Sequence, residues 1–263
     1  MRRAELREPA TKSAKHFPWF VDVHSHVVPS GDDGAQRILE GQGLCREAAR
    51  RGTAILYATP HVWPHLPLTE ERERQVQGAF AEVERAAGLE LRLGYELTPT
   101  PALLEQDLRR YVLEGTNAVL IEVPFTGSSD LLVVICEQIE AAGLQPVIAH
   151  PERTQAVLER PSLARGLAER GWLLQVNGSS LVGRHGAEPE ALAWDLVDDA
   201  LVALVGSDGH RGTRPAVLDE AYAAVRNRVG ETQARSLFDG SALAIAAEVT
   251  APPLPSRAAA RGA

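Results

Sequence analysis

The chain has 263 residues, of which 44% are hydrophobic, and its formal net charge at pH 7 is −8. This length suits one α/β barrel domain with a sizeable core. An acidic chain lacks the basic face that neutralises nucleic-acid phosphates, so we predict no nucleic-acid partner. No stretch approaches the roughly 18 apolar residues of a membrane span, and residues 1–18 contain no run like a signal peptide, so we expect no membrane insertion.

The cysteine content and the two ends of the chain set further limits. Cys45 and Cys136 are too few for a disulfide framework or a cysteine-rich zinc site, and each lies in an apolar helical pattern. We therefore predict a protein of the reducing cytoplasm. Residues 1–18 are polar and residues 251–263 are Pro/Ala-rich, so both are expected to be flexible, with a single domain over residues 19–250.

Short, continuous apolar runs alternate with longer amphipathic ones along the domain, which is typical of strands buried on both faces and of the helices that cover them. Seven runs predict strands: Phe20–Val23, Ala54–Ala58, Leu89–Leu93, Ala118–Ile121, Pro146–Ile148, Trp172–Val176 and Leu201–Val205. Because no hairpin signal joins them, we predict a parallel sheet closed into a distorted TIM-like (β/α)7 barrel. An open doubly wound sheet is the alternative, but no Gly-rich phosphate loop follows the first run.

Capping residues and breakers mark the predicted helices. A helix over Glu70–Ala87 is expected to begin at the N-cap Thr69 and to stop at Gly88. Another is predicted over Ser129–Ala142. Pro161 should split the next helical region into two pieces.

Histidines and carboxylates gather at the carboxyl ends of the predicted strands. His24 and His26 end the first strand two residues apart, so both imidazoles point to the same side and can reach one metal ion. Corresponding positions after later strands hold His61, Glu96, Glu122, His150, Asp208 and His210. In a parallel barrel these ends meet on one face, where such enzymes place their active sites.

Each of these residues alone has an ordinary explanation, since a histidine after a strand is often a loop residue and a lone glutamate can begin a helix. As a group they are more informative, because five of the eight histidines belong to it, beside the four carboxylates Asp33, Glu96, Glu122 and Asp208. So many nitrogen and oxygen ligands exceed the capacity of one ion, so we predict two or three divalent ions. With no thiolate available, Mn²⁺, Fe²⁺, Zn²⁺ and Mg²⁺ are all admissible, and the donor types do not choose among them.

Clustered divalent ions suit the hydrolysis of a phosphate ester, because they polarise phosphoryl oxygens, lower the pKa of a bridging water and stabilise the departing oxygen. Arg153, three residues after His150, is placed to neutralise a phosphate oxygen in the same mouth. Its alternative role is a surface ion pair with Glu152 or another carboxylate. We predict catalytic roles for Arg153, Asp208 and His210, with Arg153 also binding substrate.

Seven motifs between about Val21 and Arg214 together resemble a known group of proteins. They are D-V-H-S-H-V-V-P-S-G-D-D-G-A (Asp22–Ala35), A-T-P-H (Ala58–His61), G-Y-E (Gly94–Glu96), I-E-V-P-F (Ile121–Phe125), A-H-P-E-R (Ala149–Arg153), Q-V-N-G-S-S-L-V-G (Gln175–Gly183) and S-D-G-H (Ser207–His210). The sequence resembles the polymerase-and-histidinol-phosphatase (PHP) superfamily. Within it, the chain is most similar to the CpsB/CapC-type bacterial tyrosine-protein phosphatases, which are encoded with capsule and exopolysaccharide genes.

This resemblance implies a site with three metal ions and a hydroxide that attacks phosphotyrosine in line, with Arg153 as the phosphate clamp. The implied ligands are His24, His26 and Asp208 for one ion, Glu96 as a bridge to a second ion completed by Glu122 and His150, and Asp33, His61 and His210 for the third. The resemblance further implies a tyrosine-phosphorylated protein as partner, in the first place a bacterial tyrosine kinase. An oligomer is compatible with it.

Two segments near the predicted site are less certain from spacing. Asp32 is as well placed as Asp33, and we expect the one that is not a ligand to cap a helix beginning near Ala35. The apolar insert Val62–Pro67 contains Trp63, which either forms an aromatic wall for a phenyl ring or packs within its own loop.

Four other functions compete with this interpretation. A histidinol-phosphate or nucleotide phosphatase of the same superfamily would share the fold and the metals. A metal-dependent amidohydrolase usually needs a bridging lysine, and none follows Lys15. Cys45 and Arg51 have the C-x5-R spacing of cysteine phosphatases, but no glycine lies between them to form an anion-binding loop. A non-catalytic binding module need not keep every ligand.

Overall fold

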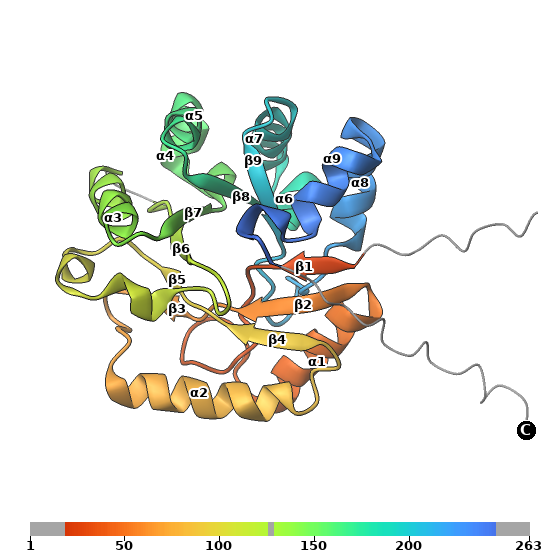
Figure 1. The fold of residues 1–263 in the computed structure, drawn as a ribbon. Coiled ribbons are helices and arrows are strands. Elements are labelled where there is room, and N and C mark those ends of the chain that lie inside the picture. Colours follow the sequence, from red (N-terminus) through yellow and green to blue (C-terminus); the bar gives the residue numbers. More distant parts are fainter. Residues whose placement is uncertain (1–18, 126–128, 246–263) are drawn as a thin grey trace, which may run out of the picture.

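The computed structural model describes residues 19–125 and 129–245 (Figure 1). Its strands are β1 (Phe20–Asp22), β2 (Thr53–Ala58), β3 (His61–Val62), β4 (Glu90–Leu93), β5 (Glu96–Leu97), β6 (Ala118–Glu122), β7 (Gln145–Ala149), β8 (Leu173–Asn177) and β9 (Val202–Gly206). Its helices are α1 (Ile38–Arg50), α2 (Glu70–Glu84), α3 (Asp130–Ala141), α4 (Gln155–Glu159), α5 (Ser162–Glu169), α6 (Gly178–Leu181), α7 (Ala187–Asp198), α8 (Asp219–Val229) and α9 (Glu231–Phe238). All seven predicted strands are present, with bounds that differ by one residue at most.

The strands are parallel and follow one another in chain order, in two sheets, β1-β2-β4 and β3-β5-β6-β7-β8-β9. Pro60 interrupts the ladder between β2 and β3 because proline has no N–H. Hydrogen bonds still cross the interruption: Gly94 N–H donates to the Ala58 carbonyl at 2.9 Å, and Glu96 N–H to the Pro60 carbonyl at 3.2 Å. The two sheets are therefore parts of one wall.

The two ends of this wall meet beyond β1 and β9. Asp208 N–H donates to the His24 carbonyl at 2.9 Å, and His26 N–H donates to the Gly209 carbonyl at 2.7 Å. These bonds complete the ring of strands at its carboxyl rim. The predicted α/β fold, with a parallel and distorted barrel, is thereby confirmed, and the rim is the place where the predicted site residues gather.

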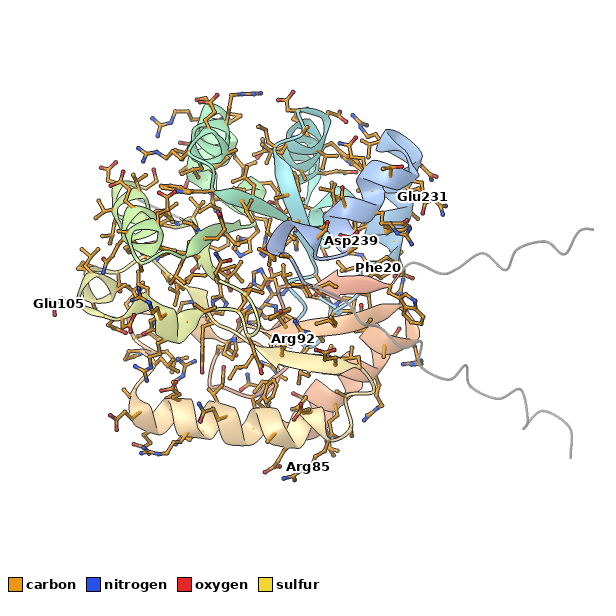
Figure 2. All side chains as sticks on the ribbon, in the orientation of Figure 1. Phe20, Arg85, Arg92, Glu105, Glu231 and Asp239 are labelled. Atoms are coloured by element: carbon orange, nitrogen blue, oxygen red, sulfur yellow. The ribbon has the colours of Figure 1, made fainter. Side chains whose placement is uncertain are left out.

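Apolar side chains pack on both sides of the strands. One buried cluster lies inside the ring and includes Val21, Ile55, Leu120 and Val147. A larger one lies between the strands and the surrounding helices, which Figure 1 shows on the outer side of the sheet. Figure 2 shows side chains filling the space between these layers. The filled interior fixes the strand ends as a rigid platform.

Most helix boundaries follow the local signals. Thr69 accepts a hydrogen bond from Arg72 N–H at 3.2 Å as the N-cap of α2, which ends three residues before the predicted Ala87. Pro161 separates α4 from α5, as predicted. The helix expected near Ala35 instead begins at Ile38, because the chain first makes a bend that carries acidic residues to the rim.

The remaining expectations concern the two ends of the chain and membrane insertion. Residues 1–18 and 251–263, expected to be flexible, lie outside the described residues. Within the described ranges, the structure contains no helix that is both long and apolar enough to span a bilayer.

Candidate metal centre

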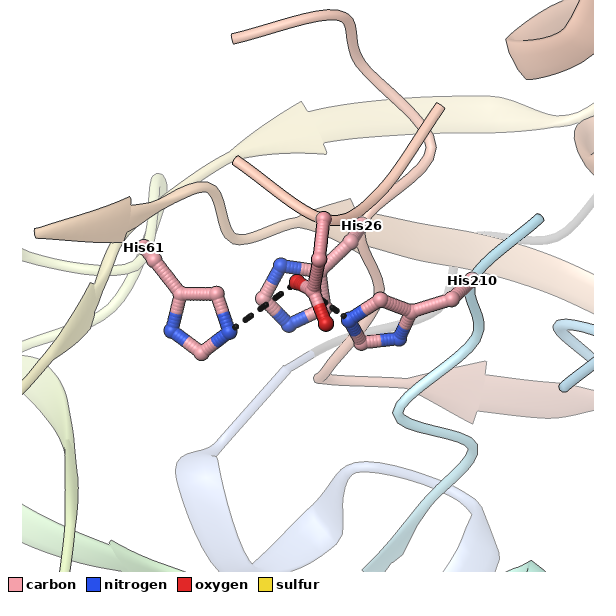
Figure 3. Close-up of side chains that lie close together, drawn as sticks. His26, His61 and His210 are labelled. Carbon is pink, nitrogen blue, oxygen red and sulfur yellow. Dashed lines mark hydrogen bonds and ion pairs between the residues drawn. The ribbon is translucent and has the colours of Figure 1, made fainter. Parts of the chain in front are cut away.

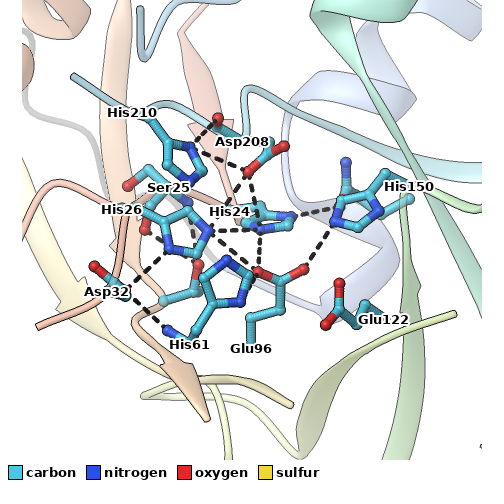
Figure 4. A network of polar contacts seen from close by, with 12 residues as sticks. His24, Ser25, His26, Asp32, His61, Glu96, Glu122, His150, Asp208 and His210 are labelled. Carbon is cyan, nitrogen blue, oxygen red and sulfur yellow. Dashed lines mark hydrogen bonds and ion pairs between the residues drawn. The ribbon is translucent and has the colours of Figure 1, made fainter. Parts of the chain in front are cut away.

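The structure brings the nine predicted ligands together at the carboxyl rim of the barrel, and Figure 4 labels all of them except Asp33. Each lies at a strand end or in the loop that follows it: His24, His26, Asp33, His61, Glu96, Glu122, His150, Asp208 and His210. Eight are buried, and only the Asp33 side chain, at 49% exposure, reaches the solvent to a large extent. The arrangement is thus a buried cluster that opens on one side.

Glu96 lies at the middle of this cluster. Its Oε2 atom is 3.2 Å from the Nε2 atoms of both His24 and His26 and 3.0 Å from His61 Nδ1, while its Oε1 is 2.8 Å from His150 Nε2. Neither Glu96 Oε2 nor His61 Nδ1 has a hydrogen-bond partner among the described residues. Buried polar atoms are rarely left unpaired. Ring nitrogens that converge on an unpaired carboxylate oxygen fit a cation between them.

Three groups of donor atoms are each compact enough to hold one ion, with all atoms in a group within 4.8 Å of one another. The groups are His26, Asp33, His61 and His210 (Figure 3), then His24, His26 and Glu96, and finally Glu96, Glu122 and His150. Asp208 Oδ1 lies 3.6 Å from His24 Nε2 and 3.5 Å from His26 Nε2, beside the second group. Imidazole and carboxylate donors suit Mn, Fe or Zn, so these residues fit divalent ions.

A chain of amide side chains orients two of these donors. His24 Nδ1–H donates to Gln175 Oε1 at 2.8 Å, which leaves the Nε2 lone pair facing the cluster. Gln175 Nε2 donates to Asn177 Oδ1 at 3.0 Å, and Asn177 Nδ2 donates to Asp208 Oδ2 at 2.9 Å. Gln175 and Asn177 belong to one of the motifs found in the sequence, but this orienting role was not predicted for them. Alternation along β8 was the available signal, because residues 175 and 177 share one face.

The structure distinguishes the roles of the neighbouring residues Asp32 and Asp33, which spacing in the sequence could not. Asp33 Oδ1 lies 3.0 Å from His210 Nε2 and 3.6 Å from His61 Nε2, on the cavity side. Asp32 lies behind His26, with its Oδ2 3.4 Å from His26 Nδ1, and accepts hydrogen bonds from the N–H groups of Gly34 and His61. The expectation that this residue caps a helix is therefore wrong: it supports His26 instead.

Two of the predicted ligands have unusual backbone conformations. His150 has φ +32° and Asp208 has φ +50°, in the left-handed region that non-glycine residues seldom adopt. Each such residue costs about 1–3 kcal/mol and persists where the surrounding structure requires it. His150 directly follows β7 and Asp208 lies two residues after β9, so in each case a turn at the strand end aims the side chain into the rim.

Burial and unbalanced charge perturb the acid–base properties of the cluster. Burial and the neighbouring negative charge of Glu96 raise the pKa of Glu122. Burial opposes charge on Glu96, but the surrounding histidines hold its pKa well below the usual range. Burial likewise opposes charge on His26, yet hydrogen bonds with Asp208, Asp32 and Glu96 raise its pKa well above normal. Divalent cations would relieve the repulsion between the two glutamates.

The cluster forms the floor of a cavity of about 200 Å³. Arg153 and Arg214 lie in its wall: Arg153 Nη1 donates to Asp208 Oδ2 at 2.5 Å, and Arg214 Nη2 donates to Asp33 Oδ2 at 2.9 Å. Of the carboxylates considered as alternative partners of Arg153, Glu152 is wrong, because it is fully buried and faces α6; Arg153 pairs with another carboxylate, Asp208, inside the cavity. Arg214 was missed, since nothing in its local sequence indicates that the chain after β9 returns to the rim.

Two aromatic rings flank the mouth of the cavity. Trp63 stacks on His61, with ring centroids 4.3 Å apart and an interplanar angle of 24°. Phe125 lies on the other side, 5.7 Å from the His150 ring and 5.6 Å from Arg153 Cζ. Of the two roles considered for Trp63, its position in the cavity lining favours the aromatic wall.

Comparison with known proteins agrees with this geometry. The family model "Capsular polysaccharide synthesis, CpsB/CapC" matches residues 20–246, nearly the whole described chain. The chain belongs to the CpsB/CapC family. Among curated members, it is 32% identical over 204 residues to the tyrosine-protein phosphatase YwqE of Bacillus subtilis, covering 72% of this chain and 77% of YwqE. It is 29% identical over 212 residues to the putative tyrosine-protein phosphatase CapC of Staphylococcus aureus, covering 77% and 82%.

Solved structures extend the family relationship to the fold. One comes from work on YwqE and on CpsB of Streptococcus pneumoniae, described as metal-dependent tyrosine phosphatases; it matches with a TM-score of 0.72 at 27% identity, covering 82% of this chain and 90% of the other. A β-aspartyl dipeptidase of Fervidobacterium islandicum matches with a TM-score of 0.52 at 13% identity, covering 87% and 74%, and shares the fold alone. The family relationship agrees with the predicted resemblance.

Proposed function

We propose that this CpsB/CapC family member is a metal-dependent phosphomonoesterase that hydrolyses phosphotyrosine in proteins. The observation that carries the proposal is the position of the histidine and carboxylate cluster: it lies below two arginines and an aromatic mouth in one cavity. The relatives named as tyrosine-protein phosphatases support the same activity.

We propose that the nine clustered residues hold two or three divalent ions, with manganese the first candidate and iron, zinc or magnesium the alternatives. Ions bound there would supply an activated water and neutralise charge on the phosphate. His210 Nδ1–H donates to the Asp208 carbonyl at 2.8 Å, so its Nε2 atom carries the lone pair that a metal ion would bind. Burial first, and then the positive charge on His26, lowers the pKa of His210, which favours the neutral form that ligation requires.

The two arginines account for recognition of the phosphate. Arg153 and Arg214 each pair with a carboxylate of the cluster, and their guanidinium groups reach the cavity from different elements. Planar guanidinium groups bind phosphate oxygens through two parallel hydrogen bonds. When the three oxygens of a phosphoryl group enter the cavity, these donors would hold it over the cluster. Asp208 keeps Arg153 extended toward that position.

The mouth favours an aromatic ester over an alkyl one. A tyrosyl ring between Trp63 and Phe125 gains about 0.5–1.5 kcal/mol from each aromatic contact beyond simple burial. A phosphoserine has a shorter side chain, so its phosphate lies closer to the backbone. With that phosphate on the cavity floor, the polar backbone would have to lie between the aromatic rings, which is less favourable than a tyrosyl ring there. We infer that the substrate is a tyrosine-phosphorylated protein, in the first place a bacterial tyrosine kinase of capsule or exopolysaccharide synthesis, and that the enzyme acts in the cytoplasm.

Comparison of three substrates under one metal condition tests this function. We expect kcat/KM for a phosphotyrosine peptide to exceed that for the matching phosphoserine peptide, and for histidinol phosphate, by at least about tenfold. Trp63→Leu should lower kcat/KM for the phosphotyrosine peptide more than it lowers kcat/KM for the phosphoserine peptide. If histidinol phosphate or a nucleotide is the better substrate, the phosphotyrosine assignment is wrong and the metal centre serves a different phosphomonoester.

A further inference from the structure

A second depression adjoins the catalytic cavity and shares two residues with it. It has a volume of about 770 Å³, and Phe125 and Arg153 line both spaces. It runs outward from these two residues between α4 and α7, with Leu158 and Leu192 in its lining. We name this depression the α4–α7 groove.

The volumes of the catalytic cavity and the α4–α7 groove indicate which part of the substrate each can hold. Pockets that enclose a small ligand measure about 300–1,000 Å³. The catalytic cavity, at about 200 Å³, is smaller than that range and has room for the phosphate and part of a ring. The rest of a phosphorylated protein must therefore lie outside the cavity. The α4–α7 groove opens beside the phosphate-binding Arg153, so the polypeptide next to the phosphotyrosine has a continuous surface to follow.

The charge of the groove differs from that of the cavity. Apart from Arg153, its charged lining consists of Glu159, Glu188 and Asp195, all three exposed. None of these carboxylates forms an ion pair with a basic side chain of the described residues, although Gln155 Nε2 donates to Glu159 Oε1 at 2.7 Å. Many exposed carboxylates of this chain do pair with arginine, as Asp199 does with Arg165. The groove thus presents a net negative charge over an apolar floor.

We propose that the α4–α7 groove binds the polypeptide on one side of the phosphotyrosine and prefers lysine or arginine there; this inference rests on the proposed phosphotyrosine phosphatase function. The aliphatic stem of a basic side chain covers apolar surface such as Leu158 and Leu192, and its charged end reaches the carboxylates. Complementary charge at an exposed rim contributes more to specificity than to affinity.

Matched phosphotyrosine peptides test this preference. Each carries two lysines, two serines or two glutamates, either before or after the phosphotyrosine, and kcat/KM is compared at low and at high salt. We expect the two-lysine peptide to exceed the two-glutamate peptide by about three- to tenfold at low salt, on one side of the phosphotyrosine only. High salt should bring the ratio toward one, because exposed charges are screened.

Variants of the groove identify the residues responsible. Glu188→Gln/Asp195→Asn should bring the lysine-to-glutamate ratio close to one, and Glu188→Lys/Asp195→Lys should invert it. The matched control Glu82→Gln/Glu105→Gln removes two exposed carboxylates elsewhere, one on α2 and one at the outer edge seen in Figure 2, and should keep the wild-type ratio. Turnover of p-nitrophenyl phosphate, which is too small to reach the groove, measures the activity of the catalytic centre in each protein and corrects for loss of folded enzyme.

The two hypotheses fail in different ways. If the wild-type enzyme hydrolyses every phosphotyrosine peptide with equal efficiency, or the groove variants keep the wild-type ratio, the groove does not bind the flanking polypeptide. If the enzyme hydrolyses p-nitrophenyl phosphate but no phosphotyrosine peptide, the proposed function itself is wrong.

Discussion

His24 donates its Nδ1–H to Gln175 Oε1 at 2.8 Å, and this one bond decides which nitrogen of His24 faces the buried cluster. The Nε2 atom is left without its proton and lies 3.2 Å from Glu96 Oε2. Gln175 is completely buried; its side chain hydrogen-bonds to His24 and Asn177, and its backbone carbonyl accepts a hydrogen bond from His150 N–H at 2.7 Å. It is a positioning residue for the proposed metal centre.

Replacing Gln175 by leucine should therefore weaken metal binding without removing a ligand. Loss of a partner that orients a histidine typically lowers metal affinity or activity about 10- to 100-fold. The measurement is a metal titration followed by activity, so that excess metal should restore part of the turnover. Gln138→Leu on α3, which loses only a surface hydrogen bond to the Leu104 carbonyl, is the control. Unchanged metal affinity in Gln175→Leu would refute the orienting role.

The arginines at the cavity should be sensitive even to a conservative change. Arg153→Lys and Arg214→Lys keep the charge but lose the two parallel donors, so kcat/KM should fall about 10- to 100-fold. Arg165→Lys, which alters an exposed pair with Asp199, should change it less than twofold. Steady-state kinetics with p-nitrophenyl phosphate compares the three. Wild-type kinetics in Arg153→Lys would rule out its phosphate role.

Arg72 should matter for stability, because it ties together the loops around the rim. Its guanidinium group donates to the carbonyls of Ser30, Leu66 and His61 at 3.1, 2.8 and 2.8 Å and is largely buried. Arg72→Met leaves these carbonyls unpaired and should lower the free energy of unfolding by about 2–5 kcal/mol. Arg74→Met, on the exposed face of α2, should change it by about 0.5 kcal/mol or less. Urea denaturation distinguishes the two outcomes.

Cys45 is expected to play no part in catalysis, despite its spacing from Arg51. The thiol is buried in α1, and burial raises its pKa to about 12, so almost no nucleophilic thiolate forms near neutral pH. Arg51 instead pairs with Asp219 and Glu220. Cys45→Ser should keep near-wild-type turnover, and iodoacetamide should not inactivate the native enzyme. A phosphocysteine trapped in mass spectrometry would overturn this prediction.

The same thiol makes a pH-dependent contribution to stability. Its pKa is near 9 in an unfolded chain and about 12 in the fold, so between these values the folded state retains a proton that the unfolded state loses. Stability contributed by Cys45 is therefore complete below about pH 9 and is lost as the pH rises toward 12. Cys45→Ala should lose less stability than the wild type between pH 8 and about pH 11. Parallel urea denaturation curves at these pH values measure the difference; equal losses would contradict it.

The main strands were predictable because each is a continuous apolar run buried on both faces, and all seven lie within one residue of their predicted bounds. The two-residue strands β3 and β5 were not, because they begin with the polar residues His61 and Glu96 and continue β2 and β4 past a break. Local sequence carries no signal for such a continuation. Only the hydrogen bonds across Pro60 reveal it.

The residues of the candidate site divide in a similar way. Histidines and acids at strand ends could be singled out, because in a parallel barrel all those ends reach one face. The supporting residues could not: Asp32 depends on the bend before α1, and Arg214 on the return of the chain after β9. Gln175 and Asn177 act through contacts with residues more than 30 positions away, which spacing does not encode.

We propose that hydrolysis at this rim requires divalent ions held by the clustered histidines and carboxylates. The most direct measurement removes bound metal with a chelator, verifies its absence by elemental analysis, and follows p-nitrophenyl phosphate hydrolysis before and after reloading. We predict that the metal-free protein is inactive and that Mn²⁺ or a similar ion restores turnover. Glu96→Gln, His150→Ala and Asp208→Asn should each lose most of both metal and activity. Full activity in protein shown to contain no metal would contradict the proposal.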